Sequence, residues 1–240
     1  MDKVIDRVKI GIVGMGQGAG TGFIATCLAR ALVKQRNFHP AVIELGQGGL
    51  FDCLGMDKHF SEQQYFSFHK AVKQDRSIRG RSNEVDGVNW MLIPPGETDY
   101  SKDLDSYRKL RLVNNGLGDV IICRFKGLQG EELWRLLWEM DRVLVVIDPL
   151  PSRMLAGYEF LCSLRVCELP ITYVINKYNK GVNRKELLDY LRLKKLIYLP
   201  LVEQEAVYAG EYICRPVYDM PVAEKQLKIP VKDLIEEILP

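Results

Sequence analysis

The chain has 240 residues, of which 47% are hydrophobic and 27% are charged, and its formal net charge is +2. This composition excludes a largely disordered chain and suits one large α/β domain or two small ones. The small charge does not indicate binding to nucleic acid or to an acidic partner. No apolar run approaches the roughly 18 residues of a membrane-spanning helix, and the N-terminal residues show no signal-peptide core. We therefore expect a cytoplasmic protein without a transmembrane segment.

The cysteines and histidines do not form a metal-binding pattern. The six cysteines are scattered through apolar segments without a Cys-x-x-Cys pair, and the three histidines stand apart from them. Zinc and iron–sulfur sites need clustered ligands at short spacing. We predict reduced cysteines, no metal ligand and no catalytic residue of this kind.

Short β-rich runs alternate with segments of helical period along the chain. The predicted strands are Val8–Val13, Ala41–Leu45, Val88–Ile93, Asp119–Cys123, Arg142–Ile147, Ile171–Ile175 and Leu196–Leu199. The predicted helices are Phe23–Lys34, Ser61–Gln74, Ser101–Asn114, Gly130–Trp138, Ser152–Val166, Arg184–Leu191 and Val231–Ile238.

Continuous apolar strands such as VLVVI must be buried on both faces. Their alternation with helices predicts an α/β fold, in which a doubly wound, mainly parallel sheet carries helices on both faces. No linker rich in proline, glycine or serine divides the chain, so we expect a single domain over residues 1–240.

A basic run interrupts this alternation between Lys70 and Arg81, with five basic residues, one acid and Gly80. Such a run is most often a solvated helix end and loop. Contact with an anion or with nucleic acid is the alternative interpretation.

The first predicted strand, KIGIV, leads through GMGQGAGTGF into the apolar helix FIATCLARALV. Glycine permits positive φ and close backbone approach, so successive N–H groups can converge on an anion. The following helix adds its unpaired N–H groups and its dipole. The order strand, glycine loop, helix therefore predicts a phosphate-binding site.

Two registers of this loop are open. Gly14-x-Gly16-x-x-Ala19 matches a Rossmann dinucleotide fingerprint, with Glu44 as the ribose-binding acid at the end of the second strand. In the P-loop register, Gly20 precedes the lysine position, which holds Thr21, and Gly22 takes the place of the magnesium-binding Ser/Thr.

Seven segments in order favour the second register, because together they resemble the ParA/MinD family of partition and division-site ATPases. Besides the glycine loop, these segments are AVIELGQGGLFDCLG, VNWMLIPPG, GDVIICRF, MDRVLVVIDPLPSRMLAGYEFL, ITYVINKYNKGV and LIYLPLVEQEAVYAG. GDVIICRF is similar to the Walker B strand. The resemblance places adenine recognition on Asn176 and on the loop that starts at Pro200, and it implies the P-loop NTPase fold.

The chain departs from the family pattern at the residues that carry the chemistry. The two loop lysines are replaced by Gly16 and Thr21, and the Walker B acid is replaced by Cys123, which Arg124 follows. Lysine and magnesium neutralise charge during phosphoryl transfer, so hydrolysis is expected to be absent or very slow. Arg124 is a candidate replacement for the missing positive charge.

The resemblance thus implies a regulatory or positioning protein that binds ATP or ADP through its backbone, while the departures weigh against magnesium. Homodimer formation or a protein partner is expected, and no specific nucleic acid. The candidate nucleotide-binding residues are Gly16, Gln17, Gly18, Ala19, Gly20, Thr21, Gly22, Phe23, Arg124, Asn176 and Pro200.

Two other functions stay open. One is an NAD(P)-binding Rossmann oxidoreductase, for which the chain offers no recognisable catalytic motif. The other is a protein-interaction module whose glycine loop binds nothing.

Overall fold

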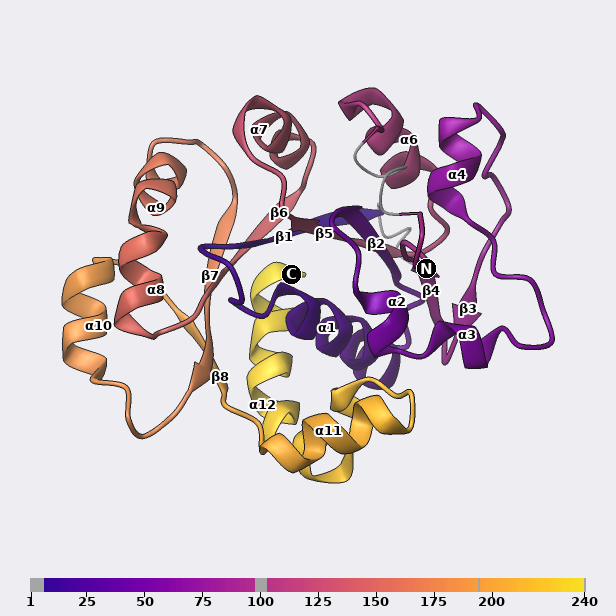
Figure 1. Cartoon of the computed structure of the whole chain (residues 1–240). Helices are drawn as coiled ribbons and strands as arrows, with labels where there is room; N and C mark the ends of the chain where they lie inside the picture. The colour runs from indigo at the N-terminus through magenta and orange to yellow at the C-terminus, as the bar shows by residue number, and fades with distance from the viewer. Residues whose placement is uncertain (1–6, 98–102, 194, 240) are drawn as a thin grey trace, which may run out of the picture.

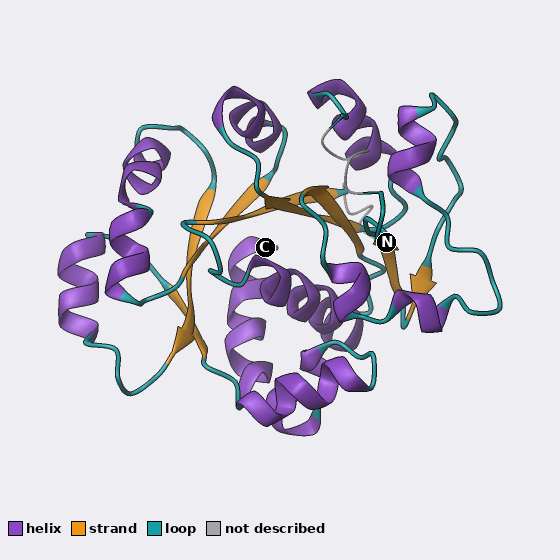
Figure 2. Cartoon of the chain, in the orientation of Figure 1, coloured by secondary structure: helices purple, strands orange, loops and turns teal. Residues whose placement is uncertain are grey.

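The computed structural model describes residues 7–97, 103–193 and 195–239. A mainly parallel sheet runs through the centre of the molecule and is covered by helices on both faces (Figures 1 and 2). Its strands are β1 (Val8–Gly14), β2 (Ala41–Gly46), β3 (Glu84–Val85), β4 (Val88–Met91), β5 (Val120–Lys126), β6 (Arg142–Ile147), β7 (Ile171–Tyr178) and β8 (Ile197–Pro200).

The strands lie in the order β3-β4-β2-β5-β1-β6-β7-β8, and β3 alone of these is antiparallel to its neighbour. From β1 the chain crosses β5 to reach β2, whereas from β6 it continues in the other direction to β7. Ligands of open α/β sheets bind at such a reversal, outside the carboxyl ends of the strands. The topology therefore places the ligand crevice at the ends of β1 and β6.

This order differs from the Rossmann order, in which the first two strands are neighbours. Here β5 pairs with both β1 and β2 and separates them. Glu44 on β2 therefore cannot take the ribose-binding place beside the first strand, and the Rossmann register of the glycine loop is wrong for this topology.

The helices divide between the two faces of the sheet. In Figure 1, α4, α6, α7 and α9 lie above the sheet, whereas α1, α11 and α12 lie below it. Their bounds are α1 Thr21–Arg36, α2 Leu50–Cys53, α3 Met56–His59, α4 Phe68–Lys73, α6 Ser106–Asn115, α7 Gly130–Trp138, α8 Pro151–Ala156, α9 Tyr158–Arg165, α10 Arg184–Leu191, α11 Gln204–Tyr212 and α12 Pro221–Ile238. Within the described residues, no helix is long and apolar enough to cross a membrane.

Alternating side chains of each strand feed two separate cores. Ile10 and Ile12 pack with α1 and α12, whereas Val13 and Cys123 pack with α7 and α9 on the opposite face. Burial on that face raises the pKa of the Cys123 thiol to about 12. Because successive residues of a strand point to opposite faces, Arg124 faces α1 and the glycine loop.

All seven predicted strands are confirmed, with changes at their ends. The two-residue strand β3 was not predicted, because it is too short to show a period. β4 ends at Met91, and β7 continues to Tyr178 through an irregularity next to Lys177, whose φ is +58°.

The predicted helix Ser61–Gln74 is wrong in its first half, because α4 begins only at Phe68. The Asn83 side chain accepts from the N–H of Phe66 and donates to its carbonyl, both at 2.9 Å. Tyr65 Oη is also within hydrogen-bond distance of the N–H of Leu92, at 2.7 Å. These tertiary contacts hold the segment extended.

The predicted helix Ser152–Val166 is divided into α8 and α9 at Gly157, where a Cβ would lie 2.2 Å from the carbonyl oxygen of Met15. The prediction missed α11 and the first ten residues of α12. α6 confirms the predicted helix Ser101–Asn114 from residue 106 onward, and residues 101–102 lie outside the described part.

Candidate functional site

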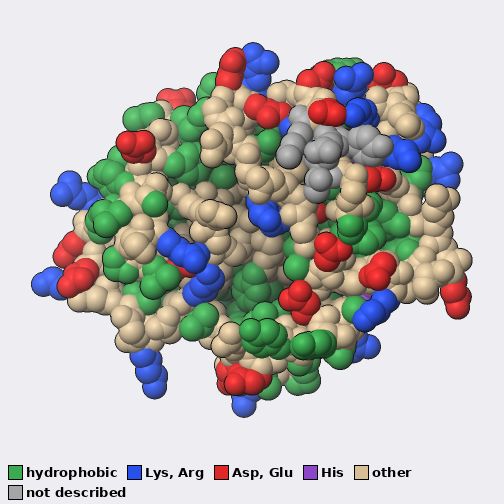
Figure 3. Space-filling view, in the orientation of Figure 1, with side chains coloured by type: hydrophobic (Ala, Val, Ile, Leu, Met, Phe, Trp, Pro, Cys, Tyr) green, Lys and Arg blue, Asp and Glu red, His purple; other side chains and the backbone are tan. Residues whose placement is uncertain are grey.

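The glycine loop joins β1 to α1 at the reversal of the sheet. Gly18 and Gly20 have φ of +73° and +98°, values that glycine adopts without strain. α1 begins at Thr21 without a side-chain cap, so the first N–H groups of this 16-residue helix have no capping side chain as partner. Figure 3 shows that this face of the molecule is hollowed near its centre, with Lys and Arg side chains beside the hollow.

Three successive carbonyl groups of the loop are each held by a side chain from another segment. Arg153 donates to the carbonyl of Gln17 at 3.2 Å. Lys177 donates to that of Gly18 at 2.8 Å, and Asn176 donates to that of Ala19 at 2.9 Å.

A carbonyl and the N–H of the next residue point in opposite directions across a trans peptide. The N–H groups of Gly18, Ala19 and Gly20 therefore point away from the three donors. That of Ala19 bonds within the loop to Gly16 at 3.4 Å. The loop is thus held in a shape that presents the N–H groups of Gly18 and Gly20 on its other side.

Asp148, directly after β6, positions two of these donors. Its Oδ2 lies 2.8 Å from Lys177 Nζ and 3.1 Å from Arg153 Nη1. The Asp148 side chain is buried, and its Oδ1 accepts from the N–H of Leu150. Asp148, Arg153 and Lys177 were not among the candidate residues that the sequence predicted for this site. The sequence did contain one indication of this role, because Asp148 directly follows the apolar strand Arg142–Ile147.

Arg124 and Glu44 form a buried ion pair beside the start of α1. Arg124 Nη1 lies 2.5 Å from Glu44 Oε1, and Arg124 Nε lies 3.4 Å from Thr21 Oγ1. The Glu44 carboxylate also accepts from the N–H groups of Leu50 and Ile93, each at 3.0 Å. Burial raises the pKa of Glu44, and these N–H donors and the guanidinium oppose that rise.

The side chains around Thr21 do not fit a magnesium ion. Magnesium prefers oxygen ligands in octahedral geometry. Here Cys123 points into the opposite core, both oxygens of Glu44 already accept from protein donors, and a guanidinium lies next to the Thr21 hydroxyl. In the described ranges, no three residues of the types His, Cys, Asp or Glu are grouped as metal ligands.

The other predicted site residues have different surroundings. Phe23 packs against the core under α1, and Gly22 adjoins Leu50 and Arg124. Asn176 is buried with its amide nitrogen on the loop, so its predicted contact with a base stays a prediction. Pro200 pairs with Tyr178 at the end of β8, and its predicted role is likewise untested.

Solved structures with the same fold belong to the ParA/MinD group. A ParA family ATPase from Chlorobium tepidum superposes with a TM-score of 0.76 and 16% identity, over 95% of this chain and 97% of that chain. The septum site-determining protein MinD of Pyrococcus horikoshii, complexed with Mg-ADP, gives 0.75 and 14%, over 95% of both chains. A chain of the MinC:MinD complex of Aquifex aeolicus gives 0.70 and 14%, over 97% of both.

No protein-family model matches the sequence, and no curated protein matches it. The structural likeness therefore shows the fold, which is an α/β fold of the ParA/MinD type.

Proposed function

We propose that this protein binds ATP or ADP through its glycine loop and acts as a regulatory or positioning protein of the ParA/MinD type, with hydrolysis absent or very slow. The observation that carries the proposal is the set of three held carbonyls at Gln17, Gly18 and Ala19. A loop fixed in this way needs little reorganisation when a phosphate group binds to its free N–H side.

Positive charge for the phosphates comes from Arg124 in this proposal. Its guanidinium adjoins Thr21 and Gly22 at the start of α1, where the helix dipole also favours an anion. Because Glu44 already pairs with this guanidinium, Arg124 supplies weaker attraction than an unpaired lysine in the loop.

Slow hydrolysis follows from the same residues. Phosphoryl transfer needs positioned cations and a metal ion to neutralise charge that develops in the transition state. The loop has neither of the two family lysines. The oxygen atoms near Thr21 already contact the guanidinium of Arg124, which leaves them poorly suited to bind magnesium. We therefore expect nucleotide binding that does not require magnesium.

Thermal unfolding with ATP or ADP, in magnesium and in EDTA, tests the binding. Nucleotide at a hundredfold excess over its Kd should stabilise the folded protein by about 2.7 kcal/mol. Phosphate release measured on the same samples tests hydrolysis. An unchanged transition at millimolar nucleotide would support the interaction module without a ligand, and tight NADH binding would contradict the proposed preference for ATP or ADP.

Arg124→Gln combined with Glu44→Gln is the sharper variant, because it removes both charges of the buried pair together. This double variant should bind ATP more weakly than the wild type while keeping its fold. Unchanged ATP affinity would show that Arg124 does not contribute charge to the site.

A homodimer or a protein partner is the expected means of action. The MinD chain of Aquifex aeolicus is crystallised together with MinC. Light scattering of this protein with and without ATP would show whether nucleotide changes its oligomeric state.

A further inference from the structure

A cavity of about 530 Å³ lies between the segment that precedes α4 and the turn that precedes β3. It lies near α4 and β3, on the right of Figure 1, whereas the glycine loop follows β1 near the centre. None of its lining residues belongs to that loop. Its volume is in the range of small-molecule sites, about 300–1,000 Å³.

The cavity is lined by more positive than negative charge. Lys70, Arg76 and Arg81 line it, and Glu97 is the acid among the described lining residues. Glu97 already accepts a hydrogen bond from Ser67. Lys70 has no ion pair within the described part of the chain. The basic run of the sequence thus contributes to a concave surface.

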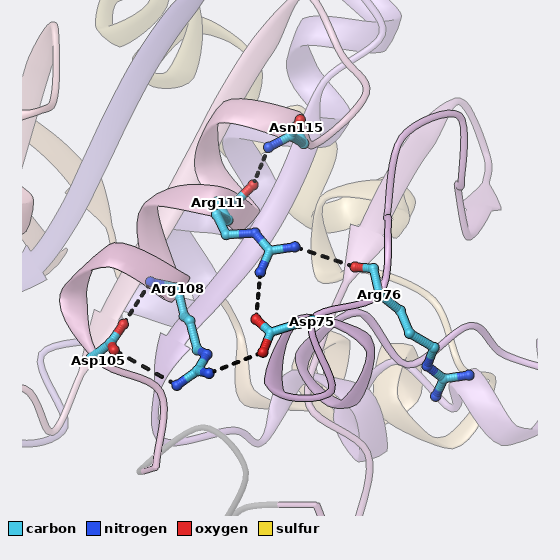
Figure 4. A network of polar contacts seen from close by, with 6 residues as sticks. All are labelled: Asp75, Arg76, Asp105, Arg108, Arg111 and Asn115. Carbon is cyan, nitrogen blue, oxygen red and sulfur yellow. Dashed lines mark hydrogen bonds and ion pairs between the residues drawn. The ribbon is translucent and has the colours of Figure 1, made fainter.

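Arg76 has no ion pair within the described residues, because its acidic neighbour is engaged elsewhere; its guanidinium donates to the amide oxygen of Gln74, which carries no charge. Arg111 and Arg108 of α6 pair with the Asp75 carboxylate at 3.0 and 3.3 Å. Figure 4 shows both arginines on Asp75, while the Arg76 side chain points away from this network. The backbone of Arg76 is fixed, because its N–H bonds to Ala71 at 2.8 Å and its carbonyl accepts from Arg111 at 3.4 Å.

Arg81 is held over an aromatic ring. Its guanidinium carbon lies 5.4 Å from the centroid of Phe66, a cation–π contact that restrains the side chain and leaves its edge donors free for an acceptor. The backbone of Phe66 is itself fixed by the buried Asn83 side chain. The wall that carries this arginine is therefore rigid.

We propose that this cavity binds a small phosphate-bearing ligand, separate from any nucleotide on the glycine loop. Two arginines with planar donor groups and one lysine suit phosphate oxygens. The uncharged polar residues Gln63, Gln64 and Ser82 also line the cavity and offer further hydrogen bonds, and Phe60, Phe66 and Ala71 add apolar surface. A concave site with cations on its walls favours a compact ligand over the backbone of an extended nucleic acid.

The test is calorimetric titration of the protein with inorganic pyrophosphate at low salt. Arg81→Gln, Arg76→Gln and Lys70→Gln should each weaken pyrophosphate binding by about three- to tenfold. Arg79→Gln is the matched control, because Arg79 belongs to the same run but bonds to Asn115 and does not line the cavity. It should bind pyrophosphate like the wild type. Thermal unfolding of each variant would confirm that it is folded.

Three outcomes would overturn the proposal. The first is equal pyrophosphate binding by the wild type and all three lining variants. The second is an equal loss in Arg79→Gln, which would indicate attraction to a charged surface, as in non-specific nucleic-acid binding. The third is loss of binding in the Arg124→Gln, Glu44→Gln variant alone, which would place pyrophosphate on the glycine loop.

Discussion

The amide nitrogen of Asn176 lies 2.9 Å from the carbonyl oxygen of Ala19, so the end of β7 is bonded directly to the glycine loop. The two residues are 157 positions apart in the sequence. Together with the contacts of Arg153 and Lys177, this bond makes the shape of the loop depend on the order of the neighbouring strands β1, β6 and β7.

Replacing Asn176 by Ala should lower the free energy of unfolding by about 1–3 kcal/mol, because the buried Ala19 carbonyl loses its side-chain donor. It should also weaken ATP binding, since the loop is less restrained. Asn114→Ala, at an exposed position on α6, is the control and should change neither. Denaturant unfolding and nucleotide titration measure the two effects. Equal stability of the two variants would contradict the role of this bond.

Gly20 should tolerate alanine much less well than Gly16. At Gly20 φ is +98° and a Cβ would lie 2.2 Å from Asn176 Nδ2, whereas at Gly16 the nearest atom would be 3.7 Å away. Gly20→Ala should therefore destabilise the protein by about 1 kcal/mol or more relative to Gly16→Ala. Thermal unfolding of both variants checks this difference, and equal melting temperatures would show that the loop can relax around a side chain.

Breaking the buried pair of Arg124 and Glu44 on one side should cost more than removing both charges. Arg124→Gln leaves the Glu44 carboxylate buried without its cation, which typically costs about 3–5 kcal/mol. The double variant with Glu44→Gln should recover part of that loss, because glutamine keeps one acceptor oxygen for the two N–H groups of Leu50 and Ile93. Denaturant unfolding at pH 7 measures the comparison. A double variant less stable than Arg124→Gln would contradict the prediction and would mean that the N–H bonds to the Glu44 carboxylate outweigh the cost of its unpaired charge.

His69 should make the stability fall in mild acid. It is buried, its Nε2 lies 2.7 Å from the carbonyl oxygen of Glu44, and burial lowers its pKa from 6.5 to about 4. Between these values the unfolded chain binds the proton more strongly, so the contribution is complete above pH 6.5 and is lost as the pH falls toward 4. The loss is about 3 kcal/mol.

His69→Gln keeps an N–H donor for the Glu44 carbonyl and does not titrate. The difference in unfolding free energy between wild type and variant, measured from pH 7.5 to 4, isolates the histidine from other groups that titrate. A difference that does not change with pH would contradict the prediction.

Local patterns were sufficient for the strands and the glycine loop. The apolar run Val143–Ile147 predicts a strand that is buried on both faces. The glycines after β1 predict a turn with positive φ. Each pattern can be recognised within one or two neighbouring elements. The order of segments then predicted the ParA/MinD type of fold, which the solved structures confirm.

Helix bounds depended on distant contacts. The segment before α4 has helical periodicity, yet Asn83 and the backbone near Leu92 pair with it and keep it extended. The helix is divided at Gly157, where the carbonyl oxygen of Met15 occupies the position that a side chain would take. Neither partner is near in the sequence, so periodicity alone could not find these ends.

The sequence therefore predicted a phosphate-binding glycine loop between a strand and a helix, while the tertiary structure decided how this loop is held. Asp148, Arg153, Lys177 and Asn176 meet it only because β6 and β7 follow β1 in the sheet. The face to which Arg124 points follows from the alternation of side chains along β5. Because β5 pairs with both β1 and β2, Arg124 then lies next to Glu44. The order of the strands in the sheet decides which charged side chains surround the loop. The sequence of any one strand does not specify that order.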